Sequence, residues 1–267
     1  GATRMSNLTE TSTPLRVFII TQDEPFFLAQ AIDYLFSILP KGVNVTGAYV
    51  LSGSPFGKMK SFAERALLTY QIFGLRFFLF YASQLVFSRL FRVSVKDVLS
   101  KHVARVRTGP IEINAKESID EIKSHEPDII ISLASNQIFH DQLLQVPKRA
   151  CLNLHTAMLP KYRGLMPLFW AMANGDEEIG VTVFEMDAGL DSGPIIQQAE
   201  VPVAAYSMHQ LIGQTKHLGM MLVARALEDY QTDSVTRRPN RDELSTRVTF
   251  PTAKDTAAFR AQGRRFF

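Results

Sequence analysis

The sequence has little cysteine and no strong excess of charge of either sign. Cys151 is the only cysteine among 267 residues, which excludes an internal disulfide framework and any metal site built from several thiolates. The 29 lysines and arginines are balanced by 26 aspartates and glutamates, and a net charge of +3 is too small to indicate a nucleic-acid-binding surface. We therefore expect a cytoplasmic protein without a nucleic-acid partner.

No apolar run in the sequence is long enough to cross a membrane without interruption. The most apolar part, residues 61–92, is broken by arginines, and 12 residues separate Arg76 from Arg89. A spanning helix needs about 18–20 apolar residues, so we do not expect this segment to span a bilayer. Gly74 divides it into two predicted helices.

Two interpretations of residues 61–92 remain open. The first is a pair of amphipathic helices that pack on the sheet or on a partner subunit, as in a homodimer. The second is a membrane-peripheral surface that contacts a bilayer or a lipid-linked substrate, with arginines at the level of the headgroups. The apolar side chains that would lie below them are Phe77, Phe78 and Phe80.

Apolar strands that alternate with helical patterns predict an α/β fold. Residues 15–20 and 43–51 are predicted strands, and apolar spacing of three and four over 26–39 predicts a helix between them. Ser207 and Gln210 form a capping-box sequence that begins another long helix. Further strands are predicted at 128–134, 150–155, 180–186 and 194–201. This order is typical of a Rossmann-like, doubly wound and mostly parallel sheet.

Composition divides the chain into three parts. Residues 1–14 are expected to be a lead, and the four residues before Met5 resemble a remnant of an expression vector. An apolar content of 46% suffices for one sizeable core, which we place in residues 15–230 with the helical insert at 61–92. Residues 231–267 are polar and end in a basic, aromatic sequence, which predicts a short C-terminal tail.

Asn153 and His155 lie two residues apart at the end of a predicted strand. Side chains two apart point to the same face, and open α/β sheets bind ligands at the carboxyl ends of their strands. A Gly- and Pro-rich loop at 187–193 holds Asp187 and Asp191. An amide that donates to an oxyanion, an imidazole that titrates near neutrality and a carboxylate that orients it are suited to acyl transfer to an amine.

Each of these residues alone has a simpler structural explanation. Asparagine and aspartate are common turn formers, and a single histidine is commonly a buried, hydrogen-bonded residue. The combination favours a functional site. A metal site is not expected, because His155, Asp187 and Asp191 come with no second histidine at helical spacing and no thiolate pair.

Four motifs resemble the signature region of the folate-dependent formyltransferase family. They are N-x-H at 153–155, L-P-K-Y-R-G at 159–164, W-A-x-x-N-G at 170–175 and D-x-G-x-D-x-G-P at 187–194. The resemblance is strong over residues 128–201. The family includes glycinamide ribonucleotide, methionyl-tRNA and amino-sugar formyltransferases. Membership would imply the formyltransferase fold and transfer of a formyl group from 10-formyltetrahydrofolate to an amine, with no metal.

The resemblance also implies roles for individual residues. Asn153 would hold the oxyanion, His155 would move protons, and Asp191 would fix the imidazole and an ordered water. The folate would be held largely by backbone groups of two loops. The matching positions are Ser132, Asn136, Gln137, Ile138, Phe139, Met186, Asp187, Ala188 and Gly189. The residues expected to contact the acceptor are Thr21, Gln22, Asp23, Tyr162 and Arg163.

The loop after the first strand, TQDEP, informs the choice of acceptor. In the glycinamide ribonucleotide enzymes this loop is rich in glycine and serine and can hold a phosphate, whereas Asp23 and Glu24 would repel phosphate and attract an ammonium group. The long C-terminal domain of methionyl-tRNA formyltransferases has no counterpart here, which disfavours aminoacyl-tRNA. We therefore expect a small amine, with a nucleotide-linked or lipid-linked amino sugar as the first candidate.

The sequence departs from the family pattern at two places. Phe184 stands where many members carry a histidine, and Thr156-Ala157 follow the catalytic histidine in place of Pro-Ser. Three alternative functions stay open. A hydrolase of 10-formyltetrahydrofolate would use the same three residues with water as acceptor. A non-catalytic relative and a peripheral membrane-binding module built on residues 61–92 are the others.

Overall fold

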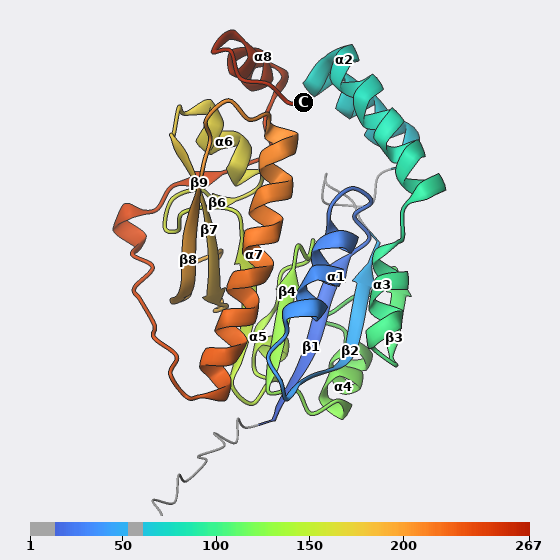
Figure 1. Cartoon of the computed structure of the whole chain (residues 1–267), viewed down its shortest axis with the longest axis vertical. Coiled ribbons are helices and arrows are strands. Elements are labelled where there is room, and N and C mark those ends of the chain that lie inside the picture. The colour runs from blue at the N-terminus through green and yellow to red at the C-terminus, as the bar shows by residue number, and fades with distance from the viewer. Residues whose placement is uncertain (1–13, 53–60) are drawn as a thin grey trace, which may run out of the picture.

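The β-branched runs form the strands of a seven-stranded sheet (Figure 1). The structure is a computed structural model that describes residues 14–52 and 61–267, so the expected lead lies outside it except for Pro14. The strands follow the spatial order β3-β2-β1-β4-β5-β7-β8. Their bounds are β1 (Leu15–Gln22), β2 (Val43–Leu51), β3 (Val106–Gly109), β4 (Ile129–Leu133), β5 (Ala150–His155), β7 (Glu178–Glu185) and β8 (Ile195–Pro202).

Neighbouring strands are parallel from β3 to β5, and β7 and β8 are added antiparallel. The predicted fold class and all six predicted strands are confirmed. β3 was not predicted, because four residues with only one large apolar side chain give no strand pattern. The chain leaves β1 toward β2 on one side and returns to β4 on the other, so the carboxyl ends of β1 and β4 form the point where ligands of open α/β sheets bind.

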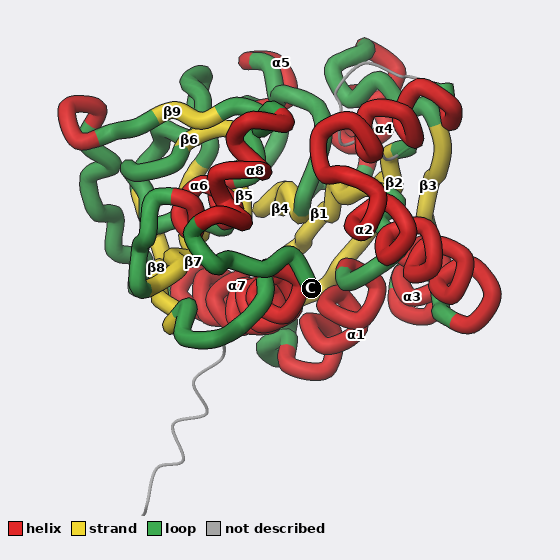
Figure 2. The backbone as a smooth tube through the Cα atoms, turned by 90° about the horizontal axis from the view of Figure 1, so that it is seen from above, coloured by secondary structure: helices red, strands yellow, loops and turns green. Residues whose placement is uncertain are grey.

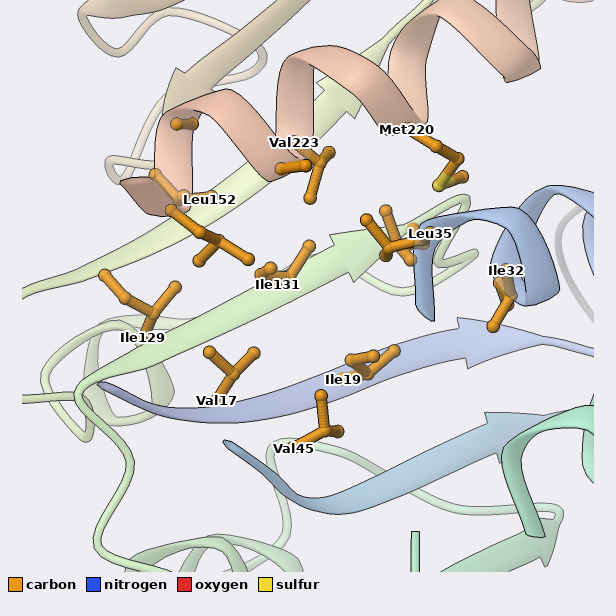
Figure 3. Packing of buried hydrophobic residues seen from close by; sticks show 14 of the residues in the cluster. Val17, Ile19, Ile32, Leu35, Val45, Ile129, Ile131, Leu152, Met220 and Val223 are labelled. Atoms are coloured by element: carbon orange, nitrogen blue, oxygen red, sulfur yellow. The ribbon is translucent and has the colours of Figure 1, made fainter. Parts of the chain in front are cut away.

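Helices cover both faces of the sheet. α1 (Leu28–Ile38), α3 (Val95–His102) and α7 (Met208–Gln231) pack on one face, and α4 (Lys116–Ser124) and α5 (Asp141–Leu144) pack on the other. Alternate residues of β1 therefore enter two cores: Val17 and Ile19 lie under α1 and α7 (Figure 3), and Phe18 and Ile20 lie against α4. The predicted capping box of Ser207 and Gln210 begins α7.

α2 (Phe62–Phe91) is broken at Gly74, where φ is 79°, so the predicted division into two helices is confirmed. Of the surfaces on which these helices were expected to pack, the sheet contributes, in the described part of the chain, only through the core cluster that Phe73 shares with Ile179 and Val201. α2 rests on α8 (Ala253–Ala261), whose Thr256 hydroxyl and Arg260 guanidinium donate to the carbonyls of Ile72 and Phe73 just before the break. α8 thus satisfies carbonyl groups at the helix kink.

One stretch in the described part of the chain, Phe62–His102, is long and apolar enough to cross a membrane by length and composition. Its most apolar window has a mean hydropathy of 1.2, and 6% of that window is buried. α2 contributes the exposed part, since it lies at the end of the molecule with α8 beside it (Figures 1 and 2).

Residues 231–267, expected as a polar tail, pack against the domain. The segment passes through a 3₁₀ turn (Asp242–Leu244) and forms β9 (Arg247–Val248), which pairs in parallel with β6 (Arg163–Gly164). Phe259 and Phe266 then bury their rings against α6 (Pro167–Ala173) and α2. Apolar residues spaced too widely to show a periodic pattern hold this segment in place.

Candidate active site

The predicted site residues of β5 lie on the face of the sheet away from α7. Leu154 contacts Gly219 of α7, whereas Cys151 faces the core under α4 and α5. Asn153 and His155 share the side of Cys151, because side chains alternate along a strand. Asn153 is in register with Ser132 of β4 and Phe184 of β7, so it lies at the junction of the parallel and antiparallel parts of the sheet.

His155 is buried, with 8% of its surface exposed, and its ring is held by backbone. Its Nε2 atom lies 2.9 Å from the carbonyl oxygen of Tyr162 and 3.9 Å from Oδ2 of Asp191. A backbone carbonyl only accepts hydrogen bonds, so this contact places the proton of the neutral ring on Nε2. Nδ1 of the neutral ring then carries the lone pair.

Asp191 reaches this histidine from the loop between β7 and β8. It adopts a left-handed conformation with φ of 49°, and its Oδ2 accepts a hydrogen bond from the Gly164 amide at 2.8 Å. Only 12% of the side chain is exposed. Asp187 instead accepts from Gly189 and Ser192 within its own loop, so of the two aspartates Asp191 alone is placed at the imidazole.

Asn153 presents its amide on the same face of β5 as His155. The side chain is half-buried, and none of the hydrogen bonds found in residues 14–52 and 61–267 involves its carboxamide. A primary amide with unused N–H groups next to a proton acceptor is suited to hold negative charge on an oxygen. The three predicted catalytic residues are therefore brought to one place.

The segment that carries the Tyr162 carbonyl is held by distant residues of the C-terminal segment. Tyr162 has φ of 58°, and its amide donates to the Thr246 hydroxyl at 2.8 Å. The guanidinium of Arg163 donates to Asp242 at 2.6 Å and to Asn240 Oδ1 at 2.8 Å. The Asn240 amide group donates in turn to the carbonyls of Asp191 and Gly193. The C-terminal segment thus ties the two loops of the site together.

No pattern in the sequence pointed to these partners. Asn240, Asp242 and Thr246 lie in a polar stretch without periodicity, and the oxygen that orients His155 belongs to the backbone. No side-chain motif could reveal them.

The residues predicted to bind the acceptor divide into exposed and buried groups. Gln22 and Asp23 line a cavity of about 620 Å³ between the β1–α1 loop and α2, and Asp23 is exposed. Thr21 is fully buried and donates to the Leu133 carbonyl. Arg163 is 1% exposed, so the prediction of acceptor contacts by the side chains of Thr21 and Arg163 is wrong. Tyr162 is mostly buried, and its hydroxyl donates to Asp176.

Glu24, in the same loop, fills the N-terminus of α1. Its carboxylate accepts hydrogen bonds from the backbone amides of Phe26, Phe27 and Leu28 at 2.7–2.9 Å. Free amides at a helix N-terminus form a ready anion site, and here the chain supplies the anion itself. This contact explains in structural terms why the loop would not hold a ligand phosphate.

Two loops predicted to bind the folate start where β4 and β7 end, and these are the strands that pair with β5. Asn136 and Gln137 bond to the carbonyls of Ser52 and Ile111, which fixes the first loop. Ser132 and Phe139 are buried and Met186 donates its amide to Cys151, whereas Asp187, Ala188 and Gly189 are exposed. Ile138 in one loop and Leu190 in the other are exposed apolar side chains, 71% and 44% respectively.

The remaining chemistry of the site is limited. Burial raises the pKa of the Cys151 thiol to about 12, so it is a poor nucleophile. In the part of the chain that the structure describes, no three histidine, cysteine or acidic side chains gather to hold a metal ion.

Comparisons with known proteins identify the family of this chain. Residues 90–227 match the model of the family described as "Formyl transferase". The methionyl-tRNA formyltransferase of Geobacter sulfurreducens is 36% identical over 152 residues, which are 53% of this chain and 48% of that protein. The chain thus spans about half the length of the curated relatives that it matches.

Two solved structures share the fold. A sugar N-formyltransferase from a Shewanella species has a TM-score of 0.57 at 16% identity, covering 92% of this chain and 86% of that one. An N-formyltransferase from Helicobacter canadensis, in complex with folinic acid and dTDP-3-aminofucose, has a TM-score of 0.56 at 16% identity, covering 88% of this chain and 70% of that one.

Proposed function

The chain belongs to the formyl transferase family, and from this premise we propose that it transfers the formyl group of 10-formyltetrahydrofolate to a primary amine. The observation that carries the proposal is the meeting of Asn153, His155 and Asp191 at the end of β5, with His155 Nε2 3.9 Å from Asp191. The folate supplies an activated formyl carbon. The chain supplies the groups that position the amine and move its proton.

The folate fits the two loops that flank β5. Ile138 and Leu190 offer one exposed apolar side chain each, and the loop backbones offer polar groups between them. An apolar site with a few placed polar groups is the usual design for a flat cofactor. Residues 132–139 and 186–189 are therefore the proposed binding segments.

The residues divide the proton and charge chemistry among them. The amine nitrogen forms a bond to the formyl carbon, and the Asn153 amide stabilises the negative charge on its oxygen. Nδ1 of His155 accepts the proton that the amine loses and returns it to the folate nitrogen that leaves. Asp191 stabilises the transiently charged imidazolium.

The cavity at the β1–α1 loop supports a small or sugar-linked amine as acceptor. The cavity opens beyond the carboxyl end of β1, and β1 and β5 both pair with β4, so the cavity lies at the same edge of the sheet as the end of β5. Asp23 offers a carboxylate for an ammonium group on this side, and the cavity of about 620 Å³ has room for a sugar. An amino sugar is the proposed acceptor class; the Helicobacter canadensis neighbour carries such a ligand.

The test is the release of tetrahydrofolate from 10-formyltetrahydrofolate, followed by absorbance, without acceptor and then with a panel of amines that includes nucleotide-linked amino sugars, aminoacyl-tRNA and glycinamide ribonucleotide. We expect release that requires an amino sugar, and none with the His155→Ala variant. Release with water alone would make the protein a hydrolase. Equal turnover of aminoacyl-tRNA would overturn the acceptor class.

A further inference from the structure

We propose that α2 is a docking surface for an anionic lipid bilayer. The inference stands on α2 itself and does not require the proposed function. It is carried by the exposure of apolar side chains along the helix, by the sign of its charges and by the way in which the domain holds it.

Exposed apolar side chains are concentrated on α2. Among the described residues, 17 large apolar side chains are exposed, and nine of them belong to this helix. These nine are Phe62, Leu67, Tyr70, Leu75, Leu79, Val86, Phe87, Leu90 and Phe91, which are 48–72% exposed. Monomeric proteins rarely leave such a contiguous apolar surface uncovered, so α2 is expected to have an occupant.

The charges of α2 indicate which kind of partner binds it. Residues 62–92 contain four arginines (65, 76, 89 and 92), of which Arg76 and Arg89 are exposed, and Glu64 is their only acidic residue. Glu64 is engaged in the capping box with Ser61. Two copies packed through α2 would bring two surfaces of net positive charge together, whereas anionic headgroups neutralise them. The arginines therefore favour a bilayer over a second copy of the chain.

The end of the C-terminal segment extends the same surface. The ring of Phe267 stacks on Phe80 of α2 at 4.3 Å between centroids, and it is 39% exposed. Arg264 and Arg265 precede it. Basic and aromatic side chains at one surface are the composition that binds the headgroup region of a membrane.

The geometry of α2 is that of a helix lying on a membrane. The break at Gly74 leaves segments of 12 and 17 residues, which are about 18 and 26 Å long, and neither spans a hydrocarbon core of about 30 Å. The second segment is tied to the β1–α1 loop, since Ser88 donates to the Pro25 carbonyl and Arg92 donates to the Phe26 carbonyl. One side of α2 is thus held by the domain while the rest is exposed.

The docking surface adjoins the acceptor cavity. α2 forms the wall of that cavity opposite Asp23, through side chains that include Arg65, Tyr81 and Arg89. Docking would bring the cavity to the lipid surface. Resting on the proposed function, this placement predicts that a lipid-linked amine is a better acceptor in vesicles than its soluble counterpart.

The experiment is sedimentation of the full chain with vesicles of phosphatidylcholine, with and without phosphatidylglycerol. We expect binding that requires phosphatidylglycerol and weakens as salt is raised. Arg76→Glu should weaken it at least fivefold, since a single arginine near an anionic surface contributes about that factor. Leu79→Ser should also weaken it.

Matched controls keep the test specific. Leu244→Ser changes a side chain with the same 58% exposure as Leu79, away from α2, and should bind as the wild type does. His155→Ala should also bind normally, which separates docking from catalysis. Equal binding of Leu79→Ser and wild type, or no sedimentation with phosphatidylglycerol, would overturn the proposal. A dimer that Leu79→Ser dissociates, or binding that resists high salt, would overturn it as well.

Discussion

The Nε2 atom of His155 lies 2.9 Å from the carbonyl oxygen of Tyr162. This contact, rather than the carboxylate at 3.9 Å, fixes the tautomer of the ring and leaves Nδ1 as the proton acceptor. Asp191 is close enough to stabilise an imidazolium by charge. The orientation and the electrostatic stabilisation of the base are therefore supplied by two different groups.

His155→Ala tests the proton acceptor. We expect the kcat of formyl transfer to fall by about 10²–10⁴-fold, the usual contribution of a general base, with little change in the KM for the folate. The urea unfolding curve serves as the control for an intact fold. Activity at the level of the wild type would contradict the mechanism.

Asp191→Asn separates charge from loop geometry. Asparagine tolerates the left-handed backbone and keeps an oxygen that can accept from the Gly164 amide, so the fold should persist. We expect kcat to fall by at least about tenfold because the imidazolium loses its counter-charge. Asp233→Asn is the matched control: it changes another left-handed aspartate, with φ of 53°, outside the proposed catalytic and binding segments, and should retain activity.

Arg163 is a buried cation paired with an exposed carboxylate, 1% against 83% exposed. Asp242→Ala leaves the buried charge without its counter-ion and should lower the free energy of unfolding by about 3 kcal/mol. Arg163→Met leaves a carboxylate that water can solvate, and should cost about 1–2 kcal/mol for its lost hydrogen bonds. Urea unfolding measures both, and the reverse order would contradict this account.

Glu24→Ala opens the N-terminus of α1. We expect a loss of about 1–2 kcal/mol of unfolding free energy, as for other helix caps. The freed amides should then bind an external anion, so inorganic phosphate should raise the melting temperature of the variant and leave that of the wild type unchanged. Asp23→Ala, one residue earlier, is the control. Equal phosphate effects on all three proteins would refute the capping role.

We expect His209 to make the contact of α2 with the domain sensitive to acid. Its ring packs between Phe27 and Phe80 at 4.7 and 5.2 Å, and burial, with Arg92 nearby, lowers its pKa while Glu24 opposes the shift. The pKa of this histidine in the unfolded chain is about 6.5. Between that pH and its lower pKa in the folded protein, the unfolded state binds more protons than the folded state does. This contribution to stability is complete above pH of about 6.5 and is lost as pH falls.

His209→Gln should therefore flatten the fall of unfolding free energy at acid pH. His125, whose pKa is also lowered by burial, lies against Phe18 far from α2 in sequence and in packing, and it provides the matched control. Unfolding by urea at several pH values measures the effect, and protease cleavage within α2 reports local release. At acid pH, α2 should resist protease cleavage in the His209→Gln variant and in neither the His125 variant nor the wild type.

Much of the fold followed from sequence pattern because the strands of the sheet are buried on both faces. β1, β4 and β5 read as continuous apolar runs, and Gly74 and the Ser207 capping box marked a helix break and a helix start. Asn153, His155 and Asp191 could be predicted because they belong to short motifs. Local pattern was sufficient wherever the determining residues lie close together in the chain.

The rest depended on contacts that no local pattern encodes. Thr21 and Arg163 were predicted to contact the acceptor, yet both side chains are buried. The Thr21 hydroxyl donates to the Leu133 carbonyl and does not face a ligand. Glu24 looked like a group facing the substrate, and the structure places it on the amides of α1. Asn240 acts on the Asp191 loop from 49 residues away, and Thr246 holds Tyr162 from 84 residues away.

That distance along the chain has a consequence for how the protein is made. A ribosome releases the residues of β5 and the Asp191 loop long before it reaches Asn240, so a nascent chain carries every predicted catalytic side chain while the bonds from Asn240 and Thr246 to the site are still missing. The order of synthesis thus delays these bonds until residues 240–246 have emerged, and we expect arrest before Asn240 to leave the two loops of the site untied.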